Sequence, residues 1–226
     1  MTKKLPNINA RDFATILNIN PYQTPFQLLE AKIENKYPFI GNKFTDHGNR
    51  YEKTAIKTYE IQTGNIVDSK QKNTKHKYYE WITGRYDGIT SIMVNEKTKT
   101  KKRKRSEFEE QNELCIVEIK CPLKKDRNEP LSLNNIPKYY WSQCQVYMNM
   151  LDCQTSHYVE YYIEPDQDEQ TAKLYYIEIK RDIQWWENSL PKIQKFHGEI
   201  RKYFEKGSLD EHPVRIAEKE WEKNLL

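Results

Sequence analysis

The sequence predicts an α/β fold in which a mixed central β-sheet is flanked by helices. Two observations carry this prediction. Segments with a helical spacing of apolar residues alternate with short runs rich in β-branched and aromatic residues. One of these runs, "ELCIVEIK" at residues 113–120, is almost continuously apolar, which is typical of a strand at the centre of a sheet. Helices on both sides of such a sheet are the packing that this order of elements favours.

Three helices are expected before the first strand. Residues 10–18 place their apolar side chains on one side of a helix. A second helix starts after Thr24, because "TPFQ" combines an N-cap residue, a proline at the first helical position and a glutamine that completes a capping box. Residues 42–62 predict a long helix, which Gly64 ends.

Three strands in a meander are expected next. They are "NIVDS" at residues 65–69, "YEWITGR" at 79–85 and "GITSIMVN" at 88–95. The following residues, 95–113, are highly charged and poor in apolar side chains, which indicates a loop. The central strand comes directly after this loop.

The remainder of the chain predicts two further strands between helices. Residues 135–152 form a helix, and strands at 156–164 and 173–181 follow, joined by the polar turn "PDQDEQ". Residues 183–206 form an aromatic-rich helix, and a short C-terminal helix closes the chain.

The length and composition indicate one intracellular domain. The 226 residues fit a single domain at 1–226, with the loop at 95–113 as an insertion and a helical tail at about 207–226. We expect no membrane association, because no run approaches the roughly 20 apolar residues of a membrane span and the N-terminus has no secretory pattern. The compartment is the cytoplasm, or the nucleus if the basic run at 101–105 is a localisation signal. The four cysteines are expected to be reduced, and Cys115 and Cys144 to be packing residues.

The positive charge of the chain is concentrated in one short run. The formal net charge is +4, and residues 97–105, "KTKTKKRKR", hold seven positive charges. Subtracting seven from +4 leaves about −3 for the rest of the chain. A surface that binds nucleic acid must therefore be local. The run itself is either an arm that tethers DNA or, because glutamates follow it closely, a self-neutralising solvated loop.

The triplet Glu-Ile-Lys occurs in two predicted strands, at residues 118–120 and 178–180. A strand points residues i and i+2 to the same face, so each triplet places a carboxylate beside an amine. A carboxylate is a ligand for Mg²⁺ or Mn²⁺, and a lysine beside it can position a water and offer charge to a reacting phosphate. A second carboxylate is needed, and Asp87 in "GRYDGIT" supplies one at a sharp turn between two strands.

The surroundings favour the first triplet. A chain this rich in glutamate and lysine contains such triplets by chance alone. The ordinary position of such a triplet is a solvated face of a strand or helix. The second triplet has Pro165-Asp166 upstream, but this pair lies in a polar turn where proline and aspartate are usual. The second strand also alternates polar and apolar residues, as an edge or half-buried strand does. We therefore predict chemistry at Glu118 and Lys120.

Four motifs, in order along the chain, resemble the lambda-type exonuclease or YqaJ-like viral recombinase branch of the PD-(D/E)XK nucleases. They are the helix "HGNRYEKTAIKTYE", the turn "GRYDGI", the strand "VEIKCP" and the helix "YYWSQCQVYMNM". The N-terminal segment "ARDFATILNINPYQTPFQLL" resembles the helical entry of the same branch. The similarity covers roughly residues 7–205, and four ordered motifs are far more specific than one triplet.

This resemblance implies a restriction-endonuclease-like core and a Mg²⁺ site in which Mn²⁺ substitutes. The implied metal ligands are Asp87, Glu118, the carbonyl of Ile119 and Glu52. The implied catalytic residues are Lys120, Glu118, Asp87, Glu52 and Gln143. The implied contacts to DNA or phosphate are Arg11, Lys4, Gln145 and Tyr147.

The chain departs from the family pattern at two positions. Tyr86 stands where the motif has proline, and because that residue shapes a turn and binds no metal, the change leaves the ligands intact. Arg11 stands where the family often has a small hydroxyl residue near a 5′-phosphate. An arginine can hold a phosphate bidentately, with Lys4 assisting, whereas the alternative is an ordinary surface residue.

The resemblance implies a 5′-to-3′ exonuclease acting at ends of double-stranded DNA, in viral or phage recombination or replication, with a single-strand annealing protein as partner. Three alternatives remain open. An endonuclease or nickase would use the same site, because one fold hosts several activities. A Cas4-like iron–sulfur exonuclease needs a cysteine cluster that the spacing does not provide. A non-catalytic DNA-binding recombination partner would bind DNA without cleaving it.

Overall fold

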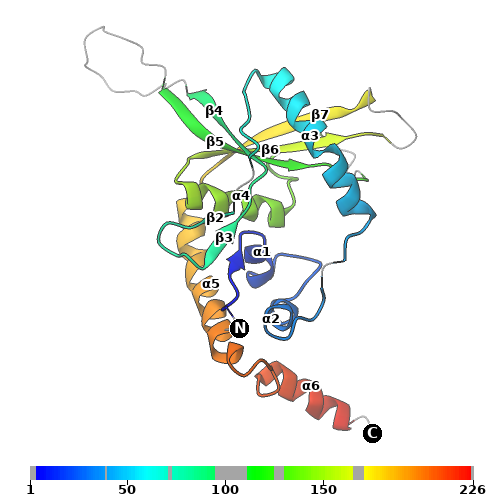
Figure 1. Ribbon diagram of the computed structural model, residues 1–226, viewed down its shortest axis with the longest axis vertical. Helices are drawn as coiled ribbons and strands as arrows, with labels where there is room; N and C mark the ends of the chain where they lie inside the picture. The colour runs from blue at the N-terminus through cyan, green and yellow to red at the C-terminus, as the bar shows by residue number, and fades with distance from the viewer. Residues whose placement is uncertain are drawn as a thin grey trace, which may run out of the picture.

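The structure, a computed structural model, describes residues 4–38, 40–70, 73–94, 111–124, 130–164 and 171–224. A four-stranded sheet lies between helices in the upper half of Figure 1, and a second, three-stranded sheet lies below it. The C-terminal helix extends away from the sheets at the lower end of the view. The arrangement confirms the predicted α/β class with helices on both faces of a mixed sheet.

The larger sheet contains the strand that was expected at its centre. It consists of β4 (Gly88–Val94), β5 (Gln111–Lys120), β6 (Thr155–Tyr162) and β7 (Lys173–Lys180), in that order. β5 runs parallel to β6, and the other neighbouring pairs are antiparallel. β5 is thus paired along both edges, in agreement with its continuous apolar pattern, whereas β7 is an edge strand, in agreement with its alternating pattern.

Helices cover both faces of this sheet. α3 (Lys43–Thr63) contacts β5, β6 and β7 from one face, and α4 (Lys138–Leu151) contacts β5 and β6 from the other (Figure 1). α5 (Ile183–Phe204) packs against α4. Alternate residues of β5 follow this division, because Val117 clusters with residues of α3 and Ile116 clusters with residues of α4.

The helix ends follow the predicted signals. α2 (Pro25–Glu34) has the expected capping box: Thr24 Oγ1 accepts from the N–H of Gln27 at 3.2 Å, and Gln27 Oε1 accepts from the N–H of Thr24 at 2.9 Å. Asn42 caps the start of α3, and Gly64 ends it with a φ of 75°. This left-handed conformation is one that glycine adopts without steric cost.

The predicted meander is wrong. β3 (Ile82–Gly84) belongs to the second sheet, between β1 (Ile8–Asn9) and β2 (Thr74–Lys75). Within the described residues, the segment "NIVDS" forms an isolated bridge between Asp68 and Ile89 and no strand. The physical reason is that β3 pairs in parallel with a strand more than seventy residues earlier, and the pattern of a short segment does not identify so distant a partner.

Other boundaries differ from the prediction at a few places. α1 (Asp12–Ile16) is shorter than the helix expected at residues 10–18. Residues 111–113 belong to β5 and not to the preceding loop. Residues 95–110, which include the basic run at 97–105, and the predicted turn at 165–170 lie outside the described residues.

The predicted C-terminal helix is present and is tied to α2. α6 (Pro213–Asn224) carries Arg215, whose guanidinium forms an ion pair with the buried carboxylate of Glu30 and lies 5.5 Å from the ring centroid of Phe26. Glu34 of α2 also accepts a hydrogen bond of 2.8 Å from the N–H of Leu209. Among the described residues, no helix combines the length and apolar composition that crossing a membrane requires.

The cysteines occupy the interior. All four are free thiols and buried, and Cys115 and Cys144 are fully enclosed, which confirms that they are packing residues. Burial raises the pKa of Cys115, Cys121 and Cys153 to about 12. Their thiols therefore stay protonated at neutral pH.

Three buried histidines predict that the protein loses stability as the pH falls. Burial lowers the pKa of His76, His157 and His197 below the usual value near 6.5. The unfolded chain then binds protons that the folded chain excludes, so the free energy of unfolding decreases as the pH drops below about 6.5. We expect the urea midpoint to be higher at pH 7.5 than at pH 5.5.

His197→Phe tests this prediction at one site. The His197 ring stacks on Trp81 at 4.1 Å, and its buried Nε2 has no hydrogen-bond partner among the described residues. Phenylalanine keeps the stack and removes the unsatisfied nitrogen, so the variant should gain about 1 kcal/mol at pH 5.5. It should also depend less on pH than the parent protein. A variant with the same pH dependence would contradict this assignment.

Candidate active site

The register of β4 and β5 brings two predicted carboxylates together. Gly88 pairs with Val117, so continuing the antiparallel register by one residue places Asp87 across from Glu118. Asp87 Oδ2 accepts a hydrogen bond of 2.8 Å from the N–H of Ile119. Asp87 is thereby fixed to the strand that carries Glu118, although the two residues are 31 positions apart in the sequence.

Glu118 and Lys120 point to the same face of β5, as predicted for residues i and i+2. Glu118 Oε1 accepts a hydrogen bond from Lys120 Nζ. The side chain of Glu118 is 1% exposed, and its second oxygen, Oε2, has no hydrogen-bond partner among the described residues. An ionised carboxylate that is buried with one oxygen unpaired is costly unless a further positive charge compensates it.

The pKa values of Glu118 and Lys120 also indicate that the site has too little positive charge. Burial raises the pKa of Glu118 to about 8, and the negative charges of Asp87 and Glu52 add to this effect. Lys120 opposes the rise. Burial disfavours the ammonium group of Lys120, but the carboxylates of Glu118 and Asp87 outweigh it and raise the pKa of the lysine. Lys120 therefore stays charged, and an additional cation would be needed to keep Glu118 ionised at neutral pH.

Glu52 approaches this pair from α3. It lies half-buried on that helix, and its charge contributes to the raised pKa values of Glu118 and Cys121. Gly48 lies one turn before Glu52 on the same helix. A Cβ at Gly48 would meet no described atom within 4 Å, so the packing of the protein itself does not require a glycine there.

α4 contributes a face of three residues at helical spacing. Gln143 Nε2 donates to the hydroxyl of Tyr147 at 3.0 Å, and this hydroxyl donates to the carbonyl of Arg85 at 2.8 Å. One turn before Gln143, the ring of Tyr140 lies 4.8 Å from Lys120 Nζ. Tyr147 is buried and bonds to Gln143 and Arg85, whereas the ring of Tyr140 contacts the lysine directly.

Gln145 has a different position from the one expected. Its Nε2 donates to the carbonyl of Lys180 at 2.9 Å, and its Oε1 accepts from the N–H of Asp182 at 2.8 Å. The side chain is fully buried and both of its polar groups are occupied by the backbone that joins β7 to α5. Gln145 thus has a structural role and is not available to DNA in this conformation.

The two predicted phosphate-binding cations lie at the surface. Arg11 occupies the N-cap position of α1 and Lys4 precedes β1, and both are exposed. Tyr86, which replaces the proline of the motif, is buried with its ring 6.3 Å from that of Tyr147. It therefore packs behind the turn that carries Asp87, as a residue that shapes this turn would.

The second Glu-Ile-Lys triplet lies at the surface of the edge strand β7. Glu178 and Lys180 form an ion pair of 2.8 Å with side chains that are 46% and 61% exposed. Such an exposed pair is screened by solvent and contributes little to stability. The structure separates two identical triplets into one that is enclosed beside Asp87 and one that is solvated.

The donor set at the first triplet fits a hard divalent cation. No group of three or more histidine, cysteine, aspartate or glutamate side chains that could hold a metal occurs in the described ranges. Mg²⁺ does not require one, because it is usually held by one or two carboxylates, with water and substrate phosphate completing its shell. Asp87, Glu118 and the carbonyl of Ile119 would supply such a set, and the unpaired Oε2 of Glu118 matches the need for positive charge.

Sequence reasoning missed Tyr140. The signal was present, because residues 140, 143 and 147 fall on one face of a helix at spacings of three and four. The sequence also does not show why residues 84 and 88 are glycines. A Cβ at Gly84 would come within 2.5 Å of the ring of Tyr147, and a Cβ at Gly88 within 2.3 Å of Val67. The segment 84–88, which joins β3 to β4 and carries Asp87, is thus closely covered by side chains at both ends.

Tyr147→Phe should weaken both stability and activity. The change leaves the carbonyl of Arg85 and the amide of Gln143 without their partner, which costs about 1–3 kcal/mol for a buried group. Because Arg85 is two residues from Asp87, we also expect DNA cleavage to slow by about 10- to 100-fold. Urea unfolding and single-turnover cleavage measure the two effects.

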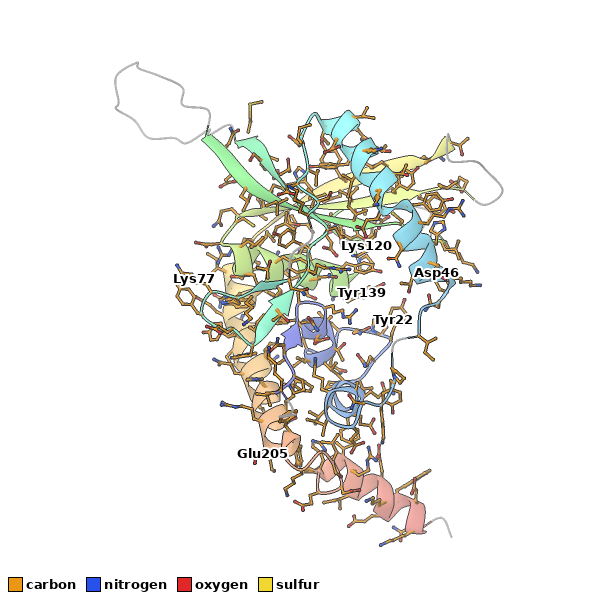
Figure 2. The ribbon with its side chains drawn as sticks, in the orientation of Figure 1. Tyr22, Asp46, Lys77, Lys120, Tyr139 and Glu205 are labelled. Atoms are coloured by element: carbon orange, nitrogen blue, oxygen red, sulfur yellow. The ribbon has the colours of Figure 1, made fainter. Side chains whose placement is uncertain are left out.

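A buried tyrosine elsewhere provides the control. Tyr203 lies near the end of α5, two residues from Glu205, which Figure 2 shows far from Lys120. Tyr203→Phe should leave the cleavage rate within twofold of the parent protein. Equal rates for the two variants would contradict the role given to the Tyr147 hydroxyl.

Comparisons with known proteins show which family and which solved structures the chain is similar to. Residues 3–154 match the model of the YqaJ-like viral recombinase domain, a stretch that includes Asp87, Glu118 and Lys120. The uncharacterized protein R354 of Acanthamoeba polyphaga mimivirus is 26% identical over 156 residues. That match covers 67% of this chain and 26% of R354, so the chain spans about a quarter of the length of this curated relative.

Two solved structures share the fold over nearly the whole chain. The alkaline exonuclease LHK-Exo of Laribacter hongkongensis, in complex with dAMP, superposes with a TM-score of 0.68 at 18% identity and covers 94% of this chain and 95% of its own. A phage-related exonuclease of Haemophilus somnus 129PT superposes with a TM-score of 0.55 at 19% identity, covering 90% and 95%. These similarities confirm the expected restriction-endonuclease-like α/β core.

Proposed function

Because the chain belongs to the YqaJ-like viral recombinase domain family, we propose that it is a divalent-metal-dependent deoxyribonuclease. One observation carries this proposal. Glu118 is enclosed beside Asp87 and Lys120, and one of its carboxylate oxygens is unpaired. An ion pair of Glu118 and Lys120 with a purely structural role would gain nothing from the carboxylate of Asp87 beside it. A site that binds a cation and a phosphate requires two carboxylates together with a lysine.

Each residue of the site has a role in phosphodiester hydrolysis. Asp87, Glu118 and the Ile119 carbonyl would hold Mg²⁺, with Glu52 assisting. When bound, Mg²⁺ supplies positive charge to the oxygens of the scissile phosphate. Lys120 holds the attacking water in line and adds charge to the phosphate in the transition state. Gln143, held by Tyr147, faces the same side of α4 as Tyr140 and is placed to orient the phosphate or the lysine.

The reaction adds water across one phosphodiester bond. The water oxygen bonds to phosphorus and gives up a proton to the solvent, the bond from phosphorus to the leaving sugar oxygen breaks, and that oxygen takes up a proton from the solvent. The carboxylates of Glu118 and Asp87 raise the pKa of Lys120, so before a metal binds the amine is in the charged form that can stabilise a phosphate.

The finer activity that we propose is a 5′-to-3′ exonuclease on double-stranded DNA, acting at ends in viral or phage recombination or replication. The fold shared with two exonucleases supports this choice, and dAMP bound to LHK-Exo is the kind of mononucleotide that an exonuclease releases. Arg11 and Lys4 are exposed cations available for the terminal phosphate. A single-strand annealing protein would be the partner that receives the strand exposed by digestion.

The experiment that tests this function compares three DNA substrates. Linear duplexes labelled at the 5′ or the 3′ end, and a covalently closed circle, are incubated with the protein and Mg²⁺, Mn²⁺ or EDTA. Early release of 5′-labelled mononucleotides, with the circle intact and no reaction in EDTA, is the expected result. Cleavage of the circle would assign an endonuclease or nickase to the same site. Binding without cleavage in any metal would overturn the nuclease proposal.

A further inference from the structure

Three tyrosines form a row that leads from the solvent to Lys120. The ring of Tyr140, which contacts Lys120, is 4.3 Å from the ring of Tyr139, and Tyr139 is 5.8 Å from Tyr22. Tyr22 is 77% exposed. Figure 2 shows Lys120, Tyr139 and Tyr22 one below the other, at the boundary between the larger sheet and the helices α1 and α2. We refer to Tyr22, Tyr139 and Tyr140 as the tyrosine row.

The backbone that carries the outermost tyrosine is held in place, although the ring is exposed. The N–H of Tyr22 donates to Asn20 Oδ1 at 3.0 Å, and Asn20 Nδ2 donates to Thr15 Oγ1 at 2.8 Å. Thr15 is buried in α1, and α2 begins three residues after Tyr22. The backbone at Tyr22 is therefore fixed at both sides. A tyrosine on an ordered backbone has only two side-chain torsions to fix when a ligand stacks on its ring, so the loss of conformational entropy is small.

The position of the row determines what can bind there. The proposed reaction places a phosphate of one DNA strand at Lys120, and the bases attached to that strand must then lie beside the phosphate path. Aromatic rings accept any base, because stacking does not depend on sequence. Lys138, exposed and adjacent to Tyr139 at the start of α4, adds a positive charge for the backbone of the same strand. A cation together with aromatic rings is the combination that binds single-stranded nucleic acid.

We propose that the tyrosine row is a stacking site for unpaired nucleobases of the DNA strand that enters the active site, with Tyr22 as the outer platform. The inference rests on the proposed nuclease function and adds a binding site for the single-stranded end to it. It implies that the terminal nucleotides separate from the complementary strand before they reach Lys120. A row with a purely internal packing role would not need an outermost ring that is mostly exposed.

Binding in the absence of metal tests the site separately from cleavage. A fluorescent single-stranded oligonucleotide is titrated in EDTA with the parent protein, Tyr22→Ala, Tyr22→Phe and Tyr78→Ala. Tyr78 is the matched control, because it is 75% exposed and its ring lies 5.3 Å from the Nζ of Lys77, which Figure 2 shows on the opposite side of the molecule from Tyr22. We expect Tyr22→Ala to bind about tenfold more weakly. Tyr22→Phe and Tyr78→Ala should stay within twofold of the parent.

An oligonucleotide without bases identifies the contact as stacking. The same titration with an abasic strand of equal length should give equal affinities for the parent protein and Tyr22→Ala, because no base is present to lose its platform. A tenfold loss that persists on the abasic strand would overturn the proposal, since the tyrosine would then act on the backbone. It would also be overturned by unchanged binding of Tyr22→Ala to the normal strand, or by a parent protein that binds neither strand.

Cleavage assays distinguish failure of this inference from failure of the proposed function. A parent protein that binds the strand through Tyr22 but cleaves no DNA would refute the nuclease and leave the stacking site intact. A protein that cleaves DNA equally well with and without the Tyr22 ring, and binds single strands equally, would refute the stacking site and leave the nuclease intact. If both hold, Tyr22→Ala should raise KM and change kcat little at a frayed end.

Discussion

Replacing Lys120 with alanine is expected to slow DNA cleavage by about 10²- to 10³-fold or more, as the loss of a charged group that stabilises a transition state does. The lysine lies on β5 beside a buried carboxylate and over the ring of Tyr140, so its position is fixed before substrate binds. Single-turnover cleavage with saturating Mg²⁺ measures the chemical step directly. Thermal unfolding of the same samples verifies that the variant is folded.

The second triplet supplies the control for this experiment. Lys180 follows the same two residues, Glu-Ile, but stands exposed on the edge strand β7. Lys180→Ala should therefore cleave DNA within twofold of the parent protein. Loss of activity in Lys180→Ala with activity retained in Lys120→Ala would move the active site to the other triplet. Equal activity in all three proteins would remove the lysine from the mechanism.

Glu118→Gln is expected to abolish tight binding of a divalent cation. The substitution keeps the size of the side chain but removes its ability to become a carboxylate. The Oε2 of Glu118 has no hydrogen-bond partner among the described residues and would be the oxygen that binds the cation. We expect the affinity for Mn²⁺ to fall by more than the roughly 10- to 100-fold that the loss of a supporting residue costs. Titration followed by the paramagnetic resonance of free Mn²⁺, without DNA, measures this affinity independently of cleavage.

The matched control is Glu178→Gln on the exposed triplet. Its carboxylate is solvated and paired with Lys180, so the affinity for Mn²⁺ should stay within twofold of the parent value. Tight Mn²⁺ binding by Glu118→Gln would contradict the assignment of Glu118 as a ligand. It would direct attention to Glu52, whose charge already influences Glu118.

The sequence was sufficient wherever a local signal determined the structure. The continuous apolar pattern of residues 113–120 located the central strand, and the capping box at Thr24 located the start of α2. It failed for β3, because a strand of three residues carries no information about a partner at the N-terminus. The burial that separates the two Glu-Ile-Lys triplets also depends on the position of each strand in the sheet, which only tertiary packing sets.

Helical spacing alone predicts that Gln143 and Gln145 point in different directions. Residues two apart on a helix do not face the same way, so only one of these glutamines can face the site. Gln143 bonds to Tyr147, whereas Gln145 holds the backbone at Lys180 and Asp182. The family pattern assigned Gln143 to catalysis and Gln145 to DNA because a pattern counts residues and ignores helical geometry. The same geometry would have found Tyr140.

The glycines on either side of Asp87 have an evolutionary consequence. Gly84 leaves room for Tyr147, and Gly88 leaves room for Val67. Val67 makes no contact that the proposed chemistry needs, so a lineage can replace Gly88 if a smaller residue appears at position 67 at the same time. Tyr147 holds Gln143 and cannot shrink without cost, so Gly84 has no such compensating path. Among homologous proteins we expect positions 67 and 88 to vary together, and positions 84 and 147 to stay unchanged.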